Sequence, residues 1–499
     1  MMLKDRTESI WEKLELPSFG RVTENLRSDI CIVGGGITGI TLAYELGRRG
    51  HKVLLVEAFS LGSGQTGRTT AHLTCQLEDP FQDLLKNHDE KTVSLFFEAH
   101  RKAIDLIEDN IIREGIDCDF KRLNGYYFCG KNVGETFLKN EKQAAISCGA
   151  DLDFCETTPL LNENVSSLKY KDQAQFHPLK YIRGLIESMK KFDVTIYEGT
   201  HIQDMRQEDR ETWNLLTDAG FEIQSHHLIV ATNTPVNNRF HIHTRQFPYR
   251  TYAVAFSIMN HFSLEECLLW DTEDPYHYVR FMDDKLIVGG EDHRVGETPQ
   301  NDPFLNIESW ARSKFTFLKD VIHKWSGQIY EPSDGIGFIG INPGLERNVY
   351  ISTGESGIGM TSSAIASQII SDLIEKKDNA WAPIFDPTRF STSGMKDFIK
   401  DNITTVRHYA DWVKPSEIDS LQEIPLDGGG VRREGLLKTC YYHDAGHFER
   451  KSAICTHLGG IVHWNDIEKT WDCPCHGSRF NTRGKVIEGP AISDLTEKE

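Results

Sequence analysis

A glycine-rich turn between two strand-like runs constrains the fold of this chain most strongly. Residues 29–33 (DICIV) form a short apolar run that favours a β-strand, and the next six residues carry glycines in the spacing G-x-G-x-x-G. Apolar residues then recur at helical spacing over 40–46, and residues 52–56 (KVLLV) predict a second strand. Strand, glycine turn, helix and strand in this order predict a βαβ unit that binds a dinucleotide.

Each position of the turn has a physical role. Gly34 allows the tight turn, Gly36 lets backbone N–H groups approach a pyrophosphate, and Gly39 lets the helix pack closely on the strand. The helix N-terminus, with Ile37 and Thr38, presents its positive end to the phosphates. Glu57 ends the second strand and can bond a ribose hydroxyl, so an unphosphorylated ribose is expected, as in FAD or NAD.

The segments that follow favour FAD. A loop of small residues spans 62–72, and further strand-to-turn signals lie at 227–233 and 349–359, the last leading into a helix predicted over 359–374. No second G-x-G-x-x-G stands in a strand context, so we expect one dinucleotide and no separate NAD domain.

At these residues the chain resembles the D-amino-acid oxidase superfamily, in the branch of glycine and sarcosine oxidases. The resemblance implies a Rossmann-like α/β FAD-binding domain with an inserted mixed β-sheet substrate domain, and a last glycine turn beside the flavin. The FAD-binding residues expected on this basis are Gly34, Gly36, Ile37, Thr38, Gly39, Glu57, Thr66, Arg68, Thr69, Thr70, His72, Gly354, Gly357, Gly359 and Met360.

A second cofactor motif lies near the C-terminus, where Cys455 and His457 precede Cys473 and His476. Two cysteines and two histidines suit a structural zinc ion or a Rieske [2Fe–2S] centre. Zinc fingers group Cys with Cys and His with His, whereas each loop here supplies one of each, as a two-iron cluster requires. About 80 residues around these loops resemble the Rieske family, which implies that the four residues are the cluster ligands.

Two departures from high-potential Rieske proteins are informative. The resemblance places a disulfide between Cys475 and a cysteine of the first loop, but that position is Gly460, so no such disulfide is expected. Ser478 keeps one hydroxyl donor to the cluster, and Phe480 replaces a tyrosine donor. Hydrogen bonds to cluster sulfur raise the potential, so we expect an intermediate value within the Rieske range of about −150 to +300 mV.

The two motifs set the expected domain order. Residues 1–28 form an N-terminal arm, and 29–394 form the FAD-dependent oxidoreductase with FAD-binding and substrate subdomains. Residues 395–420 form a connector helix and linker, and 421–499 form a small all-β Rieske domain with the cluster loops at one tip.

Flavin and cluster together predict a redox relay. The resemblance implies hydride transfer from an amine or amino-acid-like substrate to flavin, and one-electron steps through the cluster to an external acceptor, a protein or a quinone. A flavin and iron–sulfur protein that transfers electrons or senses redox state without amine turnover is the alternative. A Rieske oxygenase would also need a mononuclear iron site of two His and a carboxylate, and no such motif is evident.

The catalytic residues expected are Glu331, Tyr276, Tyr278 and Arg280. Strand alternation places Tyr276 and Tyr278 on the same face, either as an aromatic pair over the flavin or as part of a packed sheet face. Glu331 stands where relatives carry an arginine that grips the substrate carboxylate, which favours a cationic amine or else a surface role for Glu331. Arg280 or Arg250 could supply the grip instead. His72 has three open roles, namely covalent attachment to the flavin, non-covalent contact, or structural support.

Charge and composition exclude some partners. The formal net charge of −19 disfavours nucleic acid and anionic membranes as partners. No run of 18 apolar residues or signal-peptide core is present, so we expect no membrane span and a cytoplasmic location. Of the 11 cysteines, those outside the two loops show no pattern, as expected in a reducing compartment.

Overall fold

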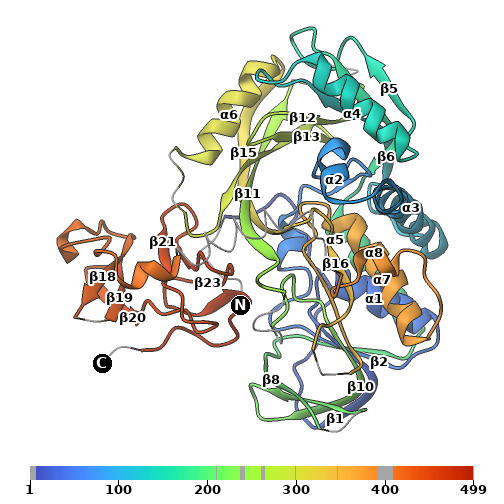
Figure 1. Cartoon of the computed structure of the whole chain (residues 1–499). Coiled ribbons are helices and arrows are strands. Elements are labelled where there is room, and N and C mark those ends of the chain that lie inside the picture. The colour runs from blue at the N-terminus through green and yellow to red at the C-terminus, as the bar shows by residue number, and fades with distance from the viewer. Residues whose placement is uncertain are drawn as a thin grey trace.

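The computed structural model describes residues 7–208, 211–236, 242–259, 265–297, 299, 301–344, 347–389, 408–435 and 437–497. Figure 1 shows a two-part flavoprotein-like body with a small C-terminal lobe beside it. The lobe contacts the body next to Thr7 of the N-terminal arm. Most of the expected connector helix falls on residues 390–407, outside the described residues.

The first sheet contains the predicted βαβ unit. Its strand order is β16-β17-β10-β1-β2-β7, with β8 and β9 added beside β10. The bounds are β1 Leu26–Val33, β2 Val53–Val56, β7 Val194–Tyr197, β8 Ile202–Gln207, β9 Trp213–Thr217, β10 Glu222–Val230, β16 Phe338–Ile341 and β17 Val349–Thr353. The central strands β17, β10, β1, β2 and β7 are parallel, as expected for a Rossmann-like domain.

The second sheet is mixed, as predicted for a substrate domain. Its order is β15-β11-β14-β13-β12-β4-β6-β3, with β5 paired to β6, and only β12 and β4 run parallel. The bounds are β3 His72–Leu73, β4 Lys121–Phe128, β5 Leu152–Cys155, β6 Ser167–Gln175, β11 Gln246–Ile258, β12 Leu268–Asp271, β13 His277–Met282, β14 Lys285–Arg294 and β15 Leu318–Pro332.

Helices cover both sheets. They are α1 Ile37–Arg48, α2 Phe81–Asn87, α3 Glu90–Glu114, α4 Glu135–Ser147, α5 Pro178–Met189, α6 Pro303–Lys314, α7 Gly359–Ile374 and α8 Ala382–Phe385, with the 3₁₀ turn η1 at Gln65–Arg68. The largest core cluster joins α1, α3, α5 and α7 to the first sheet, and a separate one lies between α6 and the second sheet (Figure 1). The helix α7 has the predicted bounds.

The C-terminal lobe is all-β, as predicted. It contains a three-stranded sheet of β18 Gly429–Glu434, β19 Leu437–Asp444 and β20 His447–Ser452, and a four-stranded sheet of β21 His463–Asn465, β22 Thr470–Asp472, β23 Arg479–Phe480 and β24 Val486–Glu488. Short 3₁₀ turns, η2 Ala410–Trp412 and η3 Leu421–Glu423, precede it. Its small core includes both cysteine loops. No described helix is long and apolar enough to cross a membrane.

Candidate functional site

The first glycine turn passes so close to other backbone atoms that a side chain at Gly34 or Gly39 would clash with them. Gly34 has φ +112°, and an added Cβ would lie 2.3 Å from the carbonyl oxygen of Ala231, just after β10. A Cβ at Gly39 would lie 1.9 Å from the carbonyl oxygen of Gly34. This close approach between the start of α1 and the end of β1 is the geometry that a bound pyrophosphate requires.

The start of α1 is open to an anion. Its N-cap is Gly36, which has no capping side chain, and the first turn carries no acidic residue. Thr66 accepts the N–H of Ile37 at 2.8 Å, so the loop after β2 reaches the same helix end. Glu57 accepts the N–H of Gly35 at 2.6 Å, and burial raises the pKa of Glu57. These residues fit FAD, and their individual roles stay predictions.

The last glycine turn joins β17 to α7 and faces the second sheet. Gly354 and Gly357 have φ +72° and +69°, and α7 begins at Gly359 without a side-chain cap. The Ser356 N–H donates to the Tyr330 carbonyl of β15 at 3.1 Å. Met360 is nearly buried in the core below the turn. An uncapped helix end between the two sheets fits the expected position beside a flavin.

The side chains and backbone of the loop over 68–72 are bonded mainly to other parts of the chain. The Arg68 guanidinium bonds Thr7, Ser326 and Glu468, so its charge faces the C-terminal lobe. The Thr69 carbonyl accepts the indole N–H of Trp11 at 2.6 Å. A flavin contact from the Arg68 guanidinium, which the resemblance implied, therefore finds no support.

His72 is held on both ring nitrogens. Its Nδ1 lies 3.1 Å from the Thr70 hydroxyl and its Nε2 lies 3.3 Å from the Val279 carbonyl. Burial first, and then Arg280, lower the pKa of His72 to about 3. A neutral imidazole with these two partners favours the structural role over covalent attachment to the flavin.

Arg280 and Arg250 do not face the substrate side. Arg280 donates to the carbonyls of Thr70, Ala71 and Phe176, and burial lowers its pKa to about 9. Arg250 bonds Ser326 and Glu468 at the boundary with the C-terminal lobe. Both arginines hold loops in place, so a grip on a substrate carboxylate by either one finds no support.

Three carboxylates and two tyrosines gather beside the last glycine turn, and we call this group the acidic cluster. It consists of Glu78, Asp292, Glu331, Tyr276 and Tyr278. An ideal Cβ on Gly357 would lie 2.9 Å from Glu78 Oε2 and 3.6 Å from the Tyr276 hydroxyl. The two tyrosine rings lie 5.6 Å apart, and the Tyr278 hydroxyl bonds Thr251 at 2.8 Å. The expected residues Glu331, Tyr276 and Tyr278 thus come together beside the last glycine turn, and their catalytic roles stay predictions.

The carboxylates of the acidic cluster have raised pKa values, although the charge of His277 lowers the pKa of Asp292 and that of Arg294 lowers the pKa of Glu331. Burial, opposed by a hydrogen bond from Tyr276, raises the pKa of Glu78 to about 8. Burial raises the pKa of Asp292 to about 7, and neither of its carboxylate oxygens has a partner of good hydrogen-bond geometry. Burial and the other carboxylates raise the pKa of Glu331 well above its usual range, and Arg294 does not cancel this rise. A cationic ligand would relieve all three.

Sequence reasoning missed Glu78 and Asp292. Glu78 lies in the loop between β3 and α2, and Asp292 lies near the end of β14, so neither belongs to a local motif. The sequence holds one indication of this group. Glu331 stands where relatives carry an arginine, which indicates a negative charge in place of a positive one.

The two cysteine loops of the C-terminal lobe fold alike. The Cys455 N–H donates to the Gly460 carbonyl at 2.7 Å, and the Cys473 N–H donates to the Ser478 carbonyl at 2.8 Å. In each loop the residue four positions after the cysteine, Gly459 or Gly477, has positive φ and donates back to the cysteine carbonyl at 3.0 Å. This repeated turn presents each cysteine and its histidine toward the other loop.

The side chains fit a [2Fe–2S] cluster. Cys455 and Cys473 are buried and close enough for their thiols to hydrogen bond, as two ligands of one iron must be. The His457 and His476 ring centroids lie 5.1 Å apart. A Cβ at Gly460 would lie 2.7 Å from Cys475 Sγ, so this glycine occupies the place of the missing disulfide partner, and none of the 11 cysteines, all of which lie in the described residues, forms a disulfide. The Ser478 hydroxyl acts on Cys455 and lowers the pKa of its thiol, and donation from Ser478 to the cluster stays a prediction.

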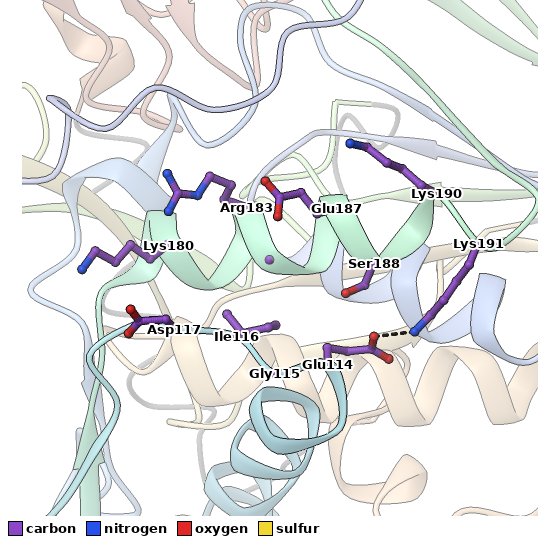
Figure 2. A pocket seen from close by; sticks show the side chains of 11 residues that line it. Glu114, Gly115, Ile116, Asp117, Lys180, Arg183, Glu187, Ser188, Lys190 and Lys191 are labelled. Atoms are coloured by element: carbon purple, nitrogen blue, oxygen red, sulfur yellow. Dashed lines mark hydrogen bonds and ion pairs between the residues drawn. The ribbon is translucent and has the colours of Figure 1, made fainter.

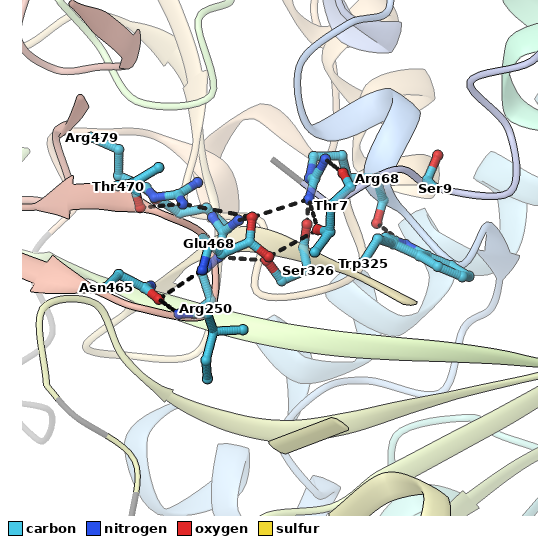
Figure 3. A network of polar contacts seen from close by, with 12 residues as sticks. Thr7, Ser9, Arg68, Arg250, Trp325, Ser326, Asn465, Glu468, Thr470 and Arg479 are labelled. Atoms are coloured by element: carbon cyan, nitrogen blue, oxygen red, sulfur yellow. Dashed lines mark hydrogen bonds and ion pairs between the residues drawn. The ribbon is translucent and has the colours of Figure 1, made fainter. Parts of the chain in front are cut away.

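A buried ion network joins the two parts of the chain (Figure 3). Glu468, in the turn between β21 and β22, has a fully buried side chain and lies 3.4 Å from Arg68, 3.3 Å from Arg250 and 3.8 Å from Arg479. Ser326 and Thr7 donate to its other oxygen at 2.5 and 2.9 Å. Burial opposes ionisation, but Arg250, Arg68 and Arg479 lower the pKa of Glu468 to about 2. The lobe is therefore docked on the loop that follows the dinucleotide turn.

A surface hollow of about 590 Å³ lies elsewhere, between the end of α3 and one side of α5 (Figure 2). Its charged rim includes Lys191, which pairs with Glu114, and Lys180, which pairs with Asp119. The hollow touches neither the glycine turns nor the cysteine loops, so it is not the reaction site.

Comparisons with known proteins agree with this geometry. Residues 29–373 match the family described as FAD dependent oxidoreductase, and residues 430–498 match the Rieske [2Fe-2S] domain. The Rieske 2Fe-2S iron-sulfur protein YhfW of Bacillus subtilis is 32% identical over 503 residues, which cover 99% of this chain and 98% of that protein.

Two further relatives match the flavoprotein part. The gamma-glutamylputrescine oxidoreductase of Escherichia coli is 23% identical over 378 residues, covering 71% of this chain and 85% of the relative. The crystal structure of glycine oxidase from Geobacillus kaustophilus aligns with a TM-score of 0.63 at 19% identity, covering 73% of this chain and all of that one. At this identity the structural match shows the fold alone.

Proposed function

The chain belongs to the FAD-dependent oxidoreductase family and carries a Rieske [2Fe-2S] domain, and from this premise we propose that it is a dehydrogenase of cationic amines. In this proposal the amine loses two electrons and two protons to become an imine, which water hydrolyses. Both electrons leave one at a time through the Rieske domain to an external one-electron acceptor. Bound FAD would supply hydride acceptance, and the [2Fe-2S] cluster would supply one-electron transfer.

The acidic cluster carries this proposal. Glu78, Asp292 and Glu331 face the last glycine turn from two strands and a loop, and their pKa values are raised even though His277 acts against the rise at Asp292 and Arg294 acts against it at Glu331. An ammonium group placed there would pair with the carboxylates, while the carboxylate of an amino acid would be repelled. The substrate is therefore an amine without a carboxylate near the reacting carbon.

The same residues can manage the proton of the substrate. An ammonium must lose a proton before hydride leaves the neighbouring carbon, and a carboxylate with pKa near 7 to 8 is matched to accept it. Glu78 and Asp292 lie in that range. The rings of Tyr276 and Tyr278 add faces that attract a cation. The name of the Escherichia coli relative refers to an amine-containing compound, which agrees with this class.

The docked Rieske domain supports transfer to an external acceptor rather than to O₂ alone. Glu468 and its arginines hold that domain against the loop that follows the dinucleotide turn, which supports electron transfer between the two parts of one chain. A simple oxidase would leave this arrangement without a task.

An anaerobic substrate panel tests the proposal. Diamines, monoamines and amino acids are mixed with the holoenzyme, and flavin absorbance and the low-temperature EPR signal of a reduced Rieske centre are followed in the same samples. We expect cationic amines without a carboxylate to bleach the flavin and the EPR signal to follow. If dithionite reduces both centres and no amine reduces either, the proposal fails, and a role in electron transfer or redox sensing replaces it. If amino acids react best, the assigned substrate class is wrong.

A further inference from the structure

Three histidines meet where the Rieske domain contacts the flavoprotein part. His457 and His476 are the expected cluster ligands, and His243 comes from the segment just before β11. The His243 ring centroid lies 4.8 Å from that of His457 and 5.6 Å from that of His476, at steep angles to both. His243 is 3% exposed, so its ring is enclosed between the two parts.

A chain of polar contacts leads from His243 to the last glycine turn. Nδ1 of His243 lies 3.5 Å from the Thr234 hydroxyl, and the Gln246 amide donates to the same oxygen at 3.2 Å. The Thr353 hydroxyl donates to Gln246 Oε1 at 3.0 Å, and Thr353 immediately precedes Gly354. A Cβ at Gly354 would lie 3.1 Å from the same Gln246 oxygen. Four side chains therefore connect the cluster ligands with the turn beside the flavin site.

We propose that His243 positions the cluster ligands against the flavin site and carries the electron path between them. This inference rests on the proposed relay. One electron at a time leaves reduced FAD and enters the oxidised cluster, and the imidazole itself gains and loses nothing. Its contribution is a ring in contact with both ligand imidazoles, tied on its other side to the turn that the flavin contacts.

The contacts around His243 support its role in the electron path. The ion network around Glu468 fixes the Rieske domain, so the three rings keep their relation without domain motion. A second contact, from the Tyr330 hydroxyl to the His476 carbonyl at 3.3 Å, reaches only the main chain of the cluster loop. His243 instead touches the side chains that hold the iron.

Light-driven reduction of the holoenzyme tests the path without any amine. A laser flash with deazaflavin as photoreductant reduces the flavin, and the absorbance of the cluster reports the following electron transfer. In His243→Ala we expect this transfer to slow roughly tenfold, at the low end of the 10–100-fold cost of losing a partner of metal ligands. We also expect the EPR g-values of the dithionite-reduced cluster to shift. A loss of packing that does not touch the cluster ligands would leave these g-values unchanged.

Two controls define the outcomes. Glu297→Gln removes a long ion pair with His408 at the edge of the same contact, and we expect wild-type rates and g-values. Tyr330→Phe removes the second contact and is expected to slow transfer less than His243→Ala. His243→Gln, which keeps a polar group, replaces the alanine variant if the latter loses its cluster.

The possible failures are separable. Wild-type protein with no transfer from flavin to cluster would overturn the relay itself. If the wild-type protein transfers electrons and a cluster-loaded His243 variant shows the same rate and the same g-values, only the role of His243 is overturned. A greater slowing of electron transfer in Tyr330→Phe than in His243→Ala would have the same meaning.

Discussion

Two groups of carboxylates in this chain, one buried and one half-buried, have opposite surroundings. Glu468 lies among three arginines, which lower its pKa to about 2 against the effect of burial. Glu331, in the acidic cluster, lies among other acids and has its pKa raised well above the usual range. A buried charge with internal partners holds a structure together, whereas acids withdrawn from water without such partners hold protons or pair with a cation that a ligand supplies. The first region is a joint, and in our proposal the second is a binding site.

The largest effect is expected from Glu468→Gln. Removing this charge leaves Arg68, Arg250 and Arg479 buried around a neutral amide, which we expect to cost roughly 3–5 kcal/mol. Denaturant unfolding measures the loss, and limited proteolysis reports whether the Rieske domain has become detached. The matched control is Glu497→Gln, which breaks an exposed pair with Lys451 in the same domain and should cost less than about 1 kcal/mol. Equal stability of both variants would show that the network does not hold the joint.

This joint should also resist acid. Because the pKa of Glu468 is depressed, its stabilisation is complete above the value for an unfolded glutamate and is lost only as the pH falls through about 2. Protection of the domain boundary from protease should therefore stay constant between pH 6 and 8.

Glu331→Gln, the same chemical change in the other region, should behave differently. No loss of stability is expected, because the raised pKa of Glu331 means that its ionised form gains little from the surrounding protein. The KM for a cationic amine should rise about 10–100-fold, because a hydrogen bond to a charged group contributes roughly 1.5–3 kcal/mol. Steady-state kinetics with Glu156→Gln, an exposed carboxylate, as control measures this. A destabilised variant with unchanged KM would make Glu331 structural.

The sequence could predict a site only where the residues of that site lie close together along the chain. Gly34 to Gly39 and the two cysteine loops each lie within a few residues, so spacing alone indicated a dinucleotide turn and a cluster site, and the matching families confirm both cofactors. Arg68 and Arg280 show the limit. Their local context resembled cofactor and substrate sites, but their partners lie 400 and more than 100 residues away in sequence. The partners of an arginine are set by the tertiary structure, so a local sequence pattern does not predict them.

The acidic cluster should titrate in the neutral range. Burial raises the pKa of Glu78 to about 8 and that of Asp292 to about 7, so protons leave these groups as the pH rises from 6 to 9. Only the ionised forms can pair with an ammonium, so kcat/KM for a cationic amine should rise with pH by up to about tenfold per unit and level off above about 8. A pH profile in constant-ionic-strength buffer measures this. A flat profile over this interval would mean that these carboxylates do not bind the amine.

The smallest effect is expected from Tyr276→Phe. The Tyr276 hydroxyl donates to Glu78 and is the strongest influence that lowers the pKa of that carboxyl against burial. Without this donor the neutral acid is favoured further, so the pH at which kcat/KM levels off should move upward. One hydrogen bond contributes about 0.5–1.5 kcal/mol, which corresponds to a shift of about one pH unit at most. The matched variant Tyr278→Phe removes a hydroxyl that bonds Thr251 instead, and it should leave the profile in place. An equal shift in both variants would show that the tyrosines act on the acidic cluster through packing, and that Glu78 is not the group whose ionisation the substrate requires.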